Sequence, residues 1–171
     1  MINLDSHYQH ILSELEKGHR GLVLFSPEEL AELTNLLHQE KELKKVLCLV
    51  EFSSKFHPPF EEELIKILRG KHDGEIIIHA LNASRKHIID ARFNKGNRLE
   101  FPFLEALQNL LYHSDPEIVE WTLRTIEASG PQGIYFQKEF AKIKPPVWKL
   151  FNPHQRAILE IITLLERRWN S

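Results

Sequence analysis

The stretch DPEIVEWTLRTIEASG, residues 115–130, follows the same plan as DGEIIIHALNASR, residues 73–85. Each begins with an aspartate, carries Glu-Ile from the second position after it, and continues with apolar residues three and four positions apart. That spacing places the apolar side chains on one face of an α-helix. Because the two aspartates are 42 positions apart, we interpret the two stretches as copies of one repeated helix.

The similarity extends to the residues before each stretch. Residues 59–81 and 102–123 both start with Pro-Phe, carry a glutamate three positions after the proline, and carry a leucine two positions beyond the glutamate. Weaker copies cover residues 26–43 and 152–168. Self-similarity at a period of about 40–47 residues is typical of arrays of helical pairs.

Three helix starts can be predicted from local sequence. Ser26 and Ser114 each begin a Ser-x-x-Glu pattern with proline in the first turn, in which serine caps a free backbone N–H and glutamate reaches back. Asn152 followed by proline is a simpler start of the same kind. Little strand is expected, and RGLVLF at residues 20–25 is at most a short extended segment with nothing to pair with.

With this period and these proline-opened helices, residues 26–168 resemble HEAT or armadillo-type repeats. The resemblance implies an all-α fold, a right-handed α–α superhelix (a HEAT-like repeat solenoid) of about three and a half repeats. We expect a single helical-repeat domain over residues 1–171, with residues 1–25 as an N-terminal capping helix and connector and residues 26–171 as the repeats. Residues 87–101 and 144–151 depart from the repeat pattern.

Composition limits the class of protein. The 171 residues are 42% hydrophobic and 27% charged, which indicates a folded globular chain rather than a disordered one. A formal net charge of −2 makes nucleic acid an unlikely partner, since broad nucleic-acid binding needs a basic surface. No apolar run approaches the roughly 18 residues of a membrane helix, and the N-terminus lacks a secretory signal pattern. We therefore expect a cytoplasmic protein without a membrane partner, and leave its oligomeric state open.

In repeat arrays of this kind the second helices line the concave side, where extended partners lie. Register between the two copies places His79 opposite Trp121 and Asn82 opposite Arg124, all on the outward side of their helices. Tryptophan and arginine one turn apart are residue types enriched at binding hot spots. These four residues form our first candidate partner-binding surface. In the alternative interpretation, Trp121 packs on the adjacent repeat with Arg124 stacked over it.

Two irregular segments offer further candidates. Arg92, Lys95 and Arg98 surround a turn and could contact an acidic partner, or they could belong to an ordinary solvated loop. In residues 144–151, two prolines precede several apolar residues, which we expect to fold onto the last helices. The alternative is that this segment presents Trp148 to a partner.

No catalytic, cofactor or metal site is predicted. His7, His10 and Glu14 lie one turn apart, but nothing else nearby supplies the convergent shell that zinc requires. Deoxyhypusine hydroxylase, a HEAT-repeat enzyme, holds iron with His-Glu pairs, and this chain has no adjacent His-Glu pair. The single cysteine, Cys48, lies in an apolar run that predicts an inert buried thiol and leaves no partner for an internal disulfide. We do not expect an enzyme.

The sequence thus predicts a non-enzymatic adaptor that binds a protein or peptide across its concave face. The alternative is a nucleic-acid-binding or DNA-repair module similar to the HEAT-like alkylpurine DNA glycosylases. Those enzymes use concave aromatic residues beside a carboxylate, a role that the resemblance would give to Trp121. One turn beyond that tryptophan, however, stands Thr125 instead of a carboxylate.

Overall fold

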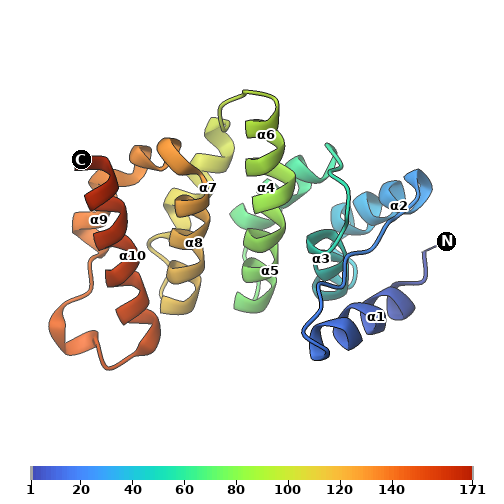
Figure 1. The fold of residues 1–171 in the computed structure, drawn as a ribbon, viewed down its shortest axis with the longest axis horizontal. Helices are drawn as coiled ribbons and strands as arrows, with labels where there is room; N and C mark the ends of the chain where they lie inside the picture. The colour runs from blue at the N-terminus through green and yellow to red at the C-terminus, as the bar shows by residue number, and fades with distance from the viewer. Residues whose placement is uncertain (1, 171) are drawn as a thin grey trace. The chain divides into compact units, whose positions relative to one another are not determined.

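The computed structural model describes residues 2–170. The chain is 73% helical and its described residues contain no strand, which confirms the predicted all-α class. None of the helices in this described part is both long enough and apolar enough to cross a membrane. The chain, drawn in Figure 1, divides into two compact units, residues 1–91 and 92–171.

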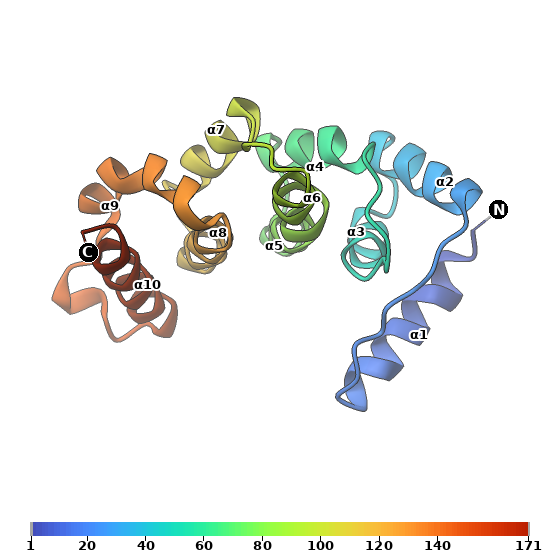
Figure 2. The same ribbon diagram turned by 45° about the horizontal axis from the view of Figure 1, so that its top comes forward.

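The first unit is built from five α-helices and a π-helical turn within its described residues. They are α1 (Leu4–Glu16), α2 (Pro27–His38), α3 (Leu43–Glu51), α4 (Phe60–Arg69), α5 (Gly74–Ser84) and η1 (Arg85–Asp90). Helix α2 packs against α3 and α4, and α5 packs against α3 and α4, while α1 lies against α3. Helices α2 and α4 therefore form one layer of this unit and α3 and α5 a second (Figure 2).

Local sequence explains where helix α2 begins. The Ser26 hydroxyl accepts a hydrogen bond from the Glu29 N–H at 3.2 Å, and the Glu29 carboxylate accepts one from the Ser26 N–H at 2.8 Å. This reciprocal capping confirms the predicted start of α2. The extended segment before it does have a partner, contrary to expectation, because Val23 forms a single parallel bridge with Ser53.

The helical backbone does not stop at Ser84, where α5 ends. It continues through η1 into the short helix α6 (Ala91–Asn94). Inside the π-helical turn, the fully buried His87 donates from Nε2 to the Val50 carbonyl at 2.8 Å. Its neighbour Lys86 donates to the carbonyls of Ser53 and Glu51. Lys86 and His87 thus bind the π-helical turn to backbone carbonyls at the end of α3.

The second unit is also built from helices. Its elements are α7 (Phe101–Leu110), α8 (Pro116–Ala128), the 3₁₀ helix η2 (Gly130–Phe136), α9 (Gln137–Ile143), the 3₁₀ turn η3 (Val147–Lys149) and α10 (Pro153–Asn170). Helix α8 packs against α7 and α10, and η2 packs against α8 and α9. Helices α7 and α9 lie on one side of this unit and α8 and α10 on the other (Figure 2).

The predicted apolar stripe of α8 is buried along its whole length, which confirms the helical register. It consists of Ile118, Val119, Thr122, Leu123 and Ile126. Thr122 avoids an unsatisfied buried hydroxyl because its Oγ1 donates to the Ile118 carbonyl at 2.8 Å. This stripe fixes which side chains of α8 face outward.

We expected the apolar residues of the segment 144–151 to fold onto the last helices, but most of them are exposed. Val147, Trp148 and Phe151 are 80%, 74% and 90% exposed. Pro145 is the buried residue of the segment, and Pro146 has the extended backbone that proline favours. Pro145 is thus buried, whereas the apolar residues that follow the two prolines are exposed.

Candidate functional site

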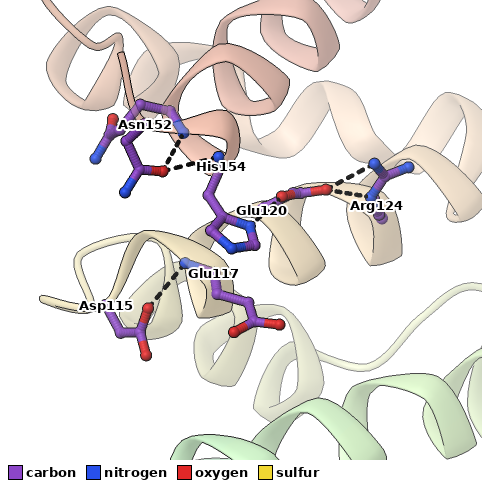
Figure 3. Close-up of polar contacts among 7 residues, drawn as sticks. Asp115, Glu117, Glu120, Arg124, Asn152 and His154 are labelled. Atoms are coloured by element: carbon purple, nitrogen blue, oxygen red, sulfur yellow. Dashed lines mark hydrogen bonds and ion pairs between the residues drawn. The ribbon is translucent and has the colours of Figure 1, made fainter. Parts of the chain in front are cut away.

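The outward face of α8 begins from a fixed helix start. The Asp115 side chain accepts a hydrogen bond from the Glu117 N–H at 2.9 Å, and Pro116 is the first helical residue (Figure 3). The prediction that Ser114 caps this helix is therefore wrong. With Pro116 as the first helical residue, Glu117 is only the second and stands one position too early for the reciprocal serine–glutamate arrangement.

Glu120 is the centre of a polar cluster on this face. It is only 8% exposed, and both of its carboxylate oxygens accept hydrogen bonds. Arg124 donates to Oε1 from Nε at 2.9 Å and from a terminal nitrogen at 2.6 Å. His154 of α10 lies with Nδ1 2.7 Å from Oε2, so Nδ1 carries the hydrogen that the carboxylate accepts (Figure 3).

The start of α10 positions His154. The Asn152 side chain accepts hydrogen bonds from the backbone N–H of His154 at 2.8 Å and of Gln155 at 3.3 Å. This cap confirms the predicted helix start at Asn152 and directs the imidazole toward α8 (Figure 3). An ion pair between the same helices joins Arg168 and Glu127 at 3.3 Å. Helices α8 and α10 are thus held together by charged contacts as well as by apolar packing.

Trp121 lies beside this cluster. Its side chain is half-buried, and the guanidinium carbon of Arg124 is 5.8 Å from the centre of its ring. The Arg124 side chain is itself 44% exposed, and only two of its five N–H donors are used by Glu120. The two residues therefore present an apolar ring edge next to a fixed cation with free donors, an arrangement that could receive a carboxylate-bearing partner.

The sequence pattern located Trp121 and Arg124 but missed Glu120 and His154. Glu120 and Arg124 are four positions apart on one helix, a spacing that could have indicated their ion pair. His154 is 34 positions from Glu120, and no local pattern connects the two.

The remaining residues of the first candidate surface belong to the other unit. His79 on α5 contacts the Glu51 carboxylate of α3, with Nδ1 3.1 Å from Oε2. Asn82 is half-buried one turn further along α5. His79 is therefore already engaged with a carboxylate within its own unit, as Arg124 is in the second unit.

The loop that carries Arg92, Lys95 and Arg98 is an ordered turn. The backbone N–H groups of Lys95 and Asn97 both donate to the Arg92 carbonyl, and Gly96 adopts the left-handed conformation with φ of 68°. The Arg92 guanidinium lies 2.6 Å from the Glu100 carboxylate. Arg98 is exposed. Because a carboxylate already faces one of its three cations, the loop is less basic than the sequence suggested.

The histidines weighed as metal ligands lie in separate contacts. His7 faces Glu29 at 3.4 Å, whereas Glu14 accepts from Lys17 at 2.8 Å and lies 3.2 Å from His19. No cluster of three potential ligands occurs within residues 2–170. Burial raises the pKa of the Cys48 thiol to about 12, which keeps it protonated at neutral pH, as expected for an inert thiol.

Comparisons with known proteins add no assignment. No protein-family model, no curated protein and no solved structure matches this chain. The functional interpretation therefore depends on the contacts described above.

Proposed function

We propose that the chain is a non-enzymatic protein- or peptide-binding adaptor built as a small HEAT-like repeat array. Its contact surface is the outward face of α8 around Trp121 and Arg124. The partner is a protein segment with an apolar side chain for the indole and a carboxylate for the guanidinium.

Packing within each unit supports the array. In the first unit, α2 and α3 make one helical pair and α4 and α5 a second, and the second helices of the pairs, α3 and α5, pack on each other. In the second unit α8 packs on α7 and on α10, while Phe140 of α9 stacks on Trp169 of α10 at 5.4 Å. Helical pairs that stack through their second helices are the building plan of such arrays.

A right-handed superhelix further requires α5 and α8 to run side by side. Distances between spin labels on these two helices test this, and a separation too long for packed helices contradicts it.

The observation that carries the binding proposal is the way Arg124 is held. Its bonds to the buried Glu120 fix the guanidinium before any partner arrives, and His154 fixes Glu120 in turn. A side chain that is already ordered loses less conformational entropy on binding. Trp121 adds a large rigid contact area with few rotatable bonds. A fixed arginine next to a half-exposed tryptophan is the composition of a hot spot.

The DNA-repair alternative has less support. A glycosylase-like mechanism needs a carboxylate free to act beside the extruded base. Glu120 is the carboxylate adjacent to Trp121, but both of its oxygens already accept hydrogen bonds from Arg124 and His154. The same surface therefore suits peptide binding better than base chemistry.

The test compares two matched double variants. In W121A/R124Q the indole and the guanidinium are lost, while glutamine can still donate to Glu120 and so protects the fold. In Y135A/K138A an exposed aromatic residue and an exposed lysine, also three positions apart, are replaced elsewhere in the second unit. Each protein is immobilised, incubated with extract of cells that produce the chain, and its bound proteins are quantified by mass spectrometry.

We expect at least one protein to bind the original chain and Y135A/K138A but not W121A/R124Q. Calorimetry with that protein should show a loss of more than about 2 kcal/mol, roughly thirtyfold in Kd, with a nearly unchanged melting temperature. If W121A/R124Q retains every bound protein, the α8 face is not the contact surface. A fall of many degrees in the melting temperature of W121A alone would assign the tryptophan to the core.

A further inference from the structure

The connection between α9 and α10 carries a compact group of very exposed apolar side chains. Val147, Trp148 and Phe151, which we call the aromatic tip, are more exposed than any other large apolar side chain within residues 2–170. In Figure 1 this connection projects past the helix ends of its own unit. Exposed apolar side chains gathered in one place, unlike scattered ones, mark an interaction site.

The tip is held in shape rather than frayed. The Lys149 N–H donates to the Pro146 carbonyl at 2.9 Å, and the Leu150 N–H donates to the Val147 carbonyl at 3.1 Å. At the far end, the Asn152 N–H donates to the Lys149 carbonyl at 3.2 Å, and the Asn152 side chain caps α10. These hydrogen bonds order the turn. Its apolar side chains are nevertheless exposed to water.

The stretch of chain that carries the tip contains basic but no acidic residues. Residues 140–159 contain four Lys and Arg and no Asp or Glu. Lys142 and Lys144 are paired with Glu139 and Glu166 at 3.1 and 3.0 Å. The other two cations, Lys149 and Arg156, are exposed and make no ion pair with any residue that the structure describes. Two unpaired cations therefore flank the apolar side chains along the chain.

Although the sequence led us to expect no membrane partner, we propose that the aromatic tip attaches this protein peripherally to anionic lipid bilayers. Tryptophan is enriched at the membrane interface, where its ring lies at the level of the headgroups, and Val147 and Phe151 reach the acyl boundary beside it. Lys149 and Arg156 remain among the negatively charged headgroups. This attachment is independent of the proposed peptide-binding face on α8.

Shape favours a bilayer over a protein partner for this site. The three apolar side chains of the tip are each at least 74% exposed, and none of them lines the neighbouring hollow of about 340 Å³ at Pro145 and Lys149. A lipid interface accepts such exposed side chains without a matching surface, and it complements the positive charge. A single tip of this size gives weak, reversible binding, as expected for an anchor that uses one small apolar insertion and two cations.

Sedimentation with lipid vesicles tests the proposal. The purified chain is mixed with vesicles of phosphatidylcholine alone or of phosphatidylcholine with phosphatidylserine, at low and at physiological salt. We expect binding to the phosphatidylserine vesicles that weakens with salt. W148A/F151A should lower the partition coefficient at least about tenfold, since two aromatic side chains no longer leave water. K149E/R156E should lower it at least about 25-fold, or about fivefold for each cation.

Two control variants in the first unit match these changes. L22A/L24A removes two exposed leucines, and K55E/K71E produces the same change in net charge as K149E/R156E. Neither should alter sedimentation. A loss in K55E/K71E equal to that in K149E/R156E would attribute binding to net charge and overturn the proposal. Failure of the original chain to sediment with either vesicle would also overturn it.

Fluorescence separates insertion of the tip from binding by another surface. Trp148 should shift its emission to shorter wavelength on vesicles, because its indole leaves water. W148F keeps an aromatic ring and should still sediment, but the vesicle-induced shift should disappear. If W148F binds and shows the full shift, then another tryptophan enters the lipid and the tip is not the anchor.

Discussion

Helices α5 and α8 start from matching sequence 42 positions apart, and they differ most where they end. In α8, Ser129 is buried with its hydroxyl bonded to the Ile126 carbonyl at 2.6 Å, and Gly130 follows with φ of 57°. The equivalent positions after α5 are His87 and Ile88. Helix α8 therefore ends at Ala128, whereas the helical backbone continues after α5 through η1.

The difference follows from two side chains. Glycine adopts the left-handed conformation that ends a helix without steric cost, and a serine beside it is small enough to be buried. Neither residue is available after α5, so the backbone remains helical. A buried imidazole needs more room than a hydroxyl, and it coincides with the π-helical turn that aims it at Val50. The matched positions thus form a helix end after α8 and a tertiary contact after α5.

The matched core positions of α5 and α8 are expected to show the largest effect on stability. Leu81 of α5 and Leu123 of α8 stand at matched positions and are both fully buried. Replacing either with alanine should lower the free energy of unfolding by about 2–5 kcal/mol, because a cavity is left in the core. Urea denaturation followed by circular dichroism measures both. A cost below about 1 kcal/mol at one of them would mean that the two helices do not bury equivalent faces.

His87, in the turn after α5, should give the next largest effect on stability, and this effect depends on pH. Burial, reinforced by the positive charge of Lys86, lowers the pKa of His87 from 6.5 to about 4. The unfolded chain therefore binds a proton on this imidazole at higher pH than the folded chain does. Stability is fully present above pH 6.5 and is lost as the pH falls toward 4, by about 3 kcal/mol for this group.

Amide hydrogen exchange in α5 measures this loss at pH 7 and at pH 4.5. His87→Gln keeps a donor for the Val50 carbonyl without the titration, so its stability should depend less on pH over this range. The three tryptophans all lie in the second unit, and their fluorescence reports that unit separately. An equal pH dependence in His87→Gln would assign the acid sensitivity to other groups, such as the carboxylates whose pKa values are lowered by their partners.

Repetition and helical periodicity were enough to predict the all-α class, the start of α2 and the buried stripe of α8, because these depend on residues close in sequence. Long-range contacts were not predictable in the same way. The spacing of Trp121 and Arg124 placed them together on a face, but the link from Glu120 to His154 exists only because α10 packs on α8.

The aromatic tip shows the opposite failure. Apolar composition predicted that Trp148 and its neighbours would be buried, on the general rule that large apolar side chains leave water. The buried position in this segment belongs instead to Pro145, and Pro146 has an extended backbone before the exposed residues. Composition alone does not state which residue of an apolar segment is the one to be buried.

The start of the two helices should give the smallest difference, and it tests how far their equivalence extends. Both begin after an aspartate, but only Asp115 makes a side-chain cap, whereas Asp73 makes none. Asp115→Ala should therefore cost about 1 kcal/mol, the usual value of a lost cap, and Asp73→Ala only a small fraction of that. Both aspartates are exposed at a helix N-terminus, so the general attraction to the helix dipole is lost equally in the two variants. Urea denaturation of the two variants side by side isolates the cap bond itself. Equal losses would show that the dipole and not the hydrogen bond dominates at Asp115, and the two helix starts would then be energetically equivalent despite their different contacts.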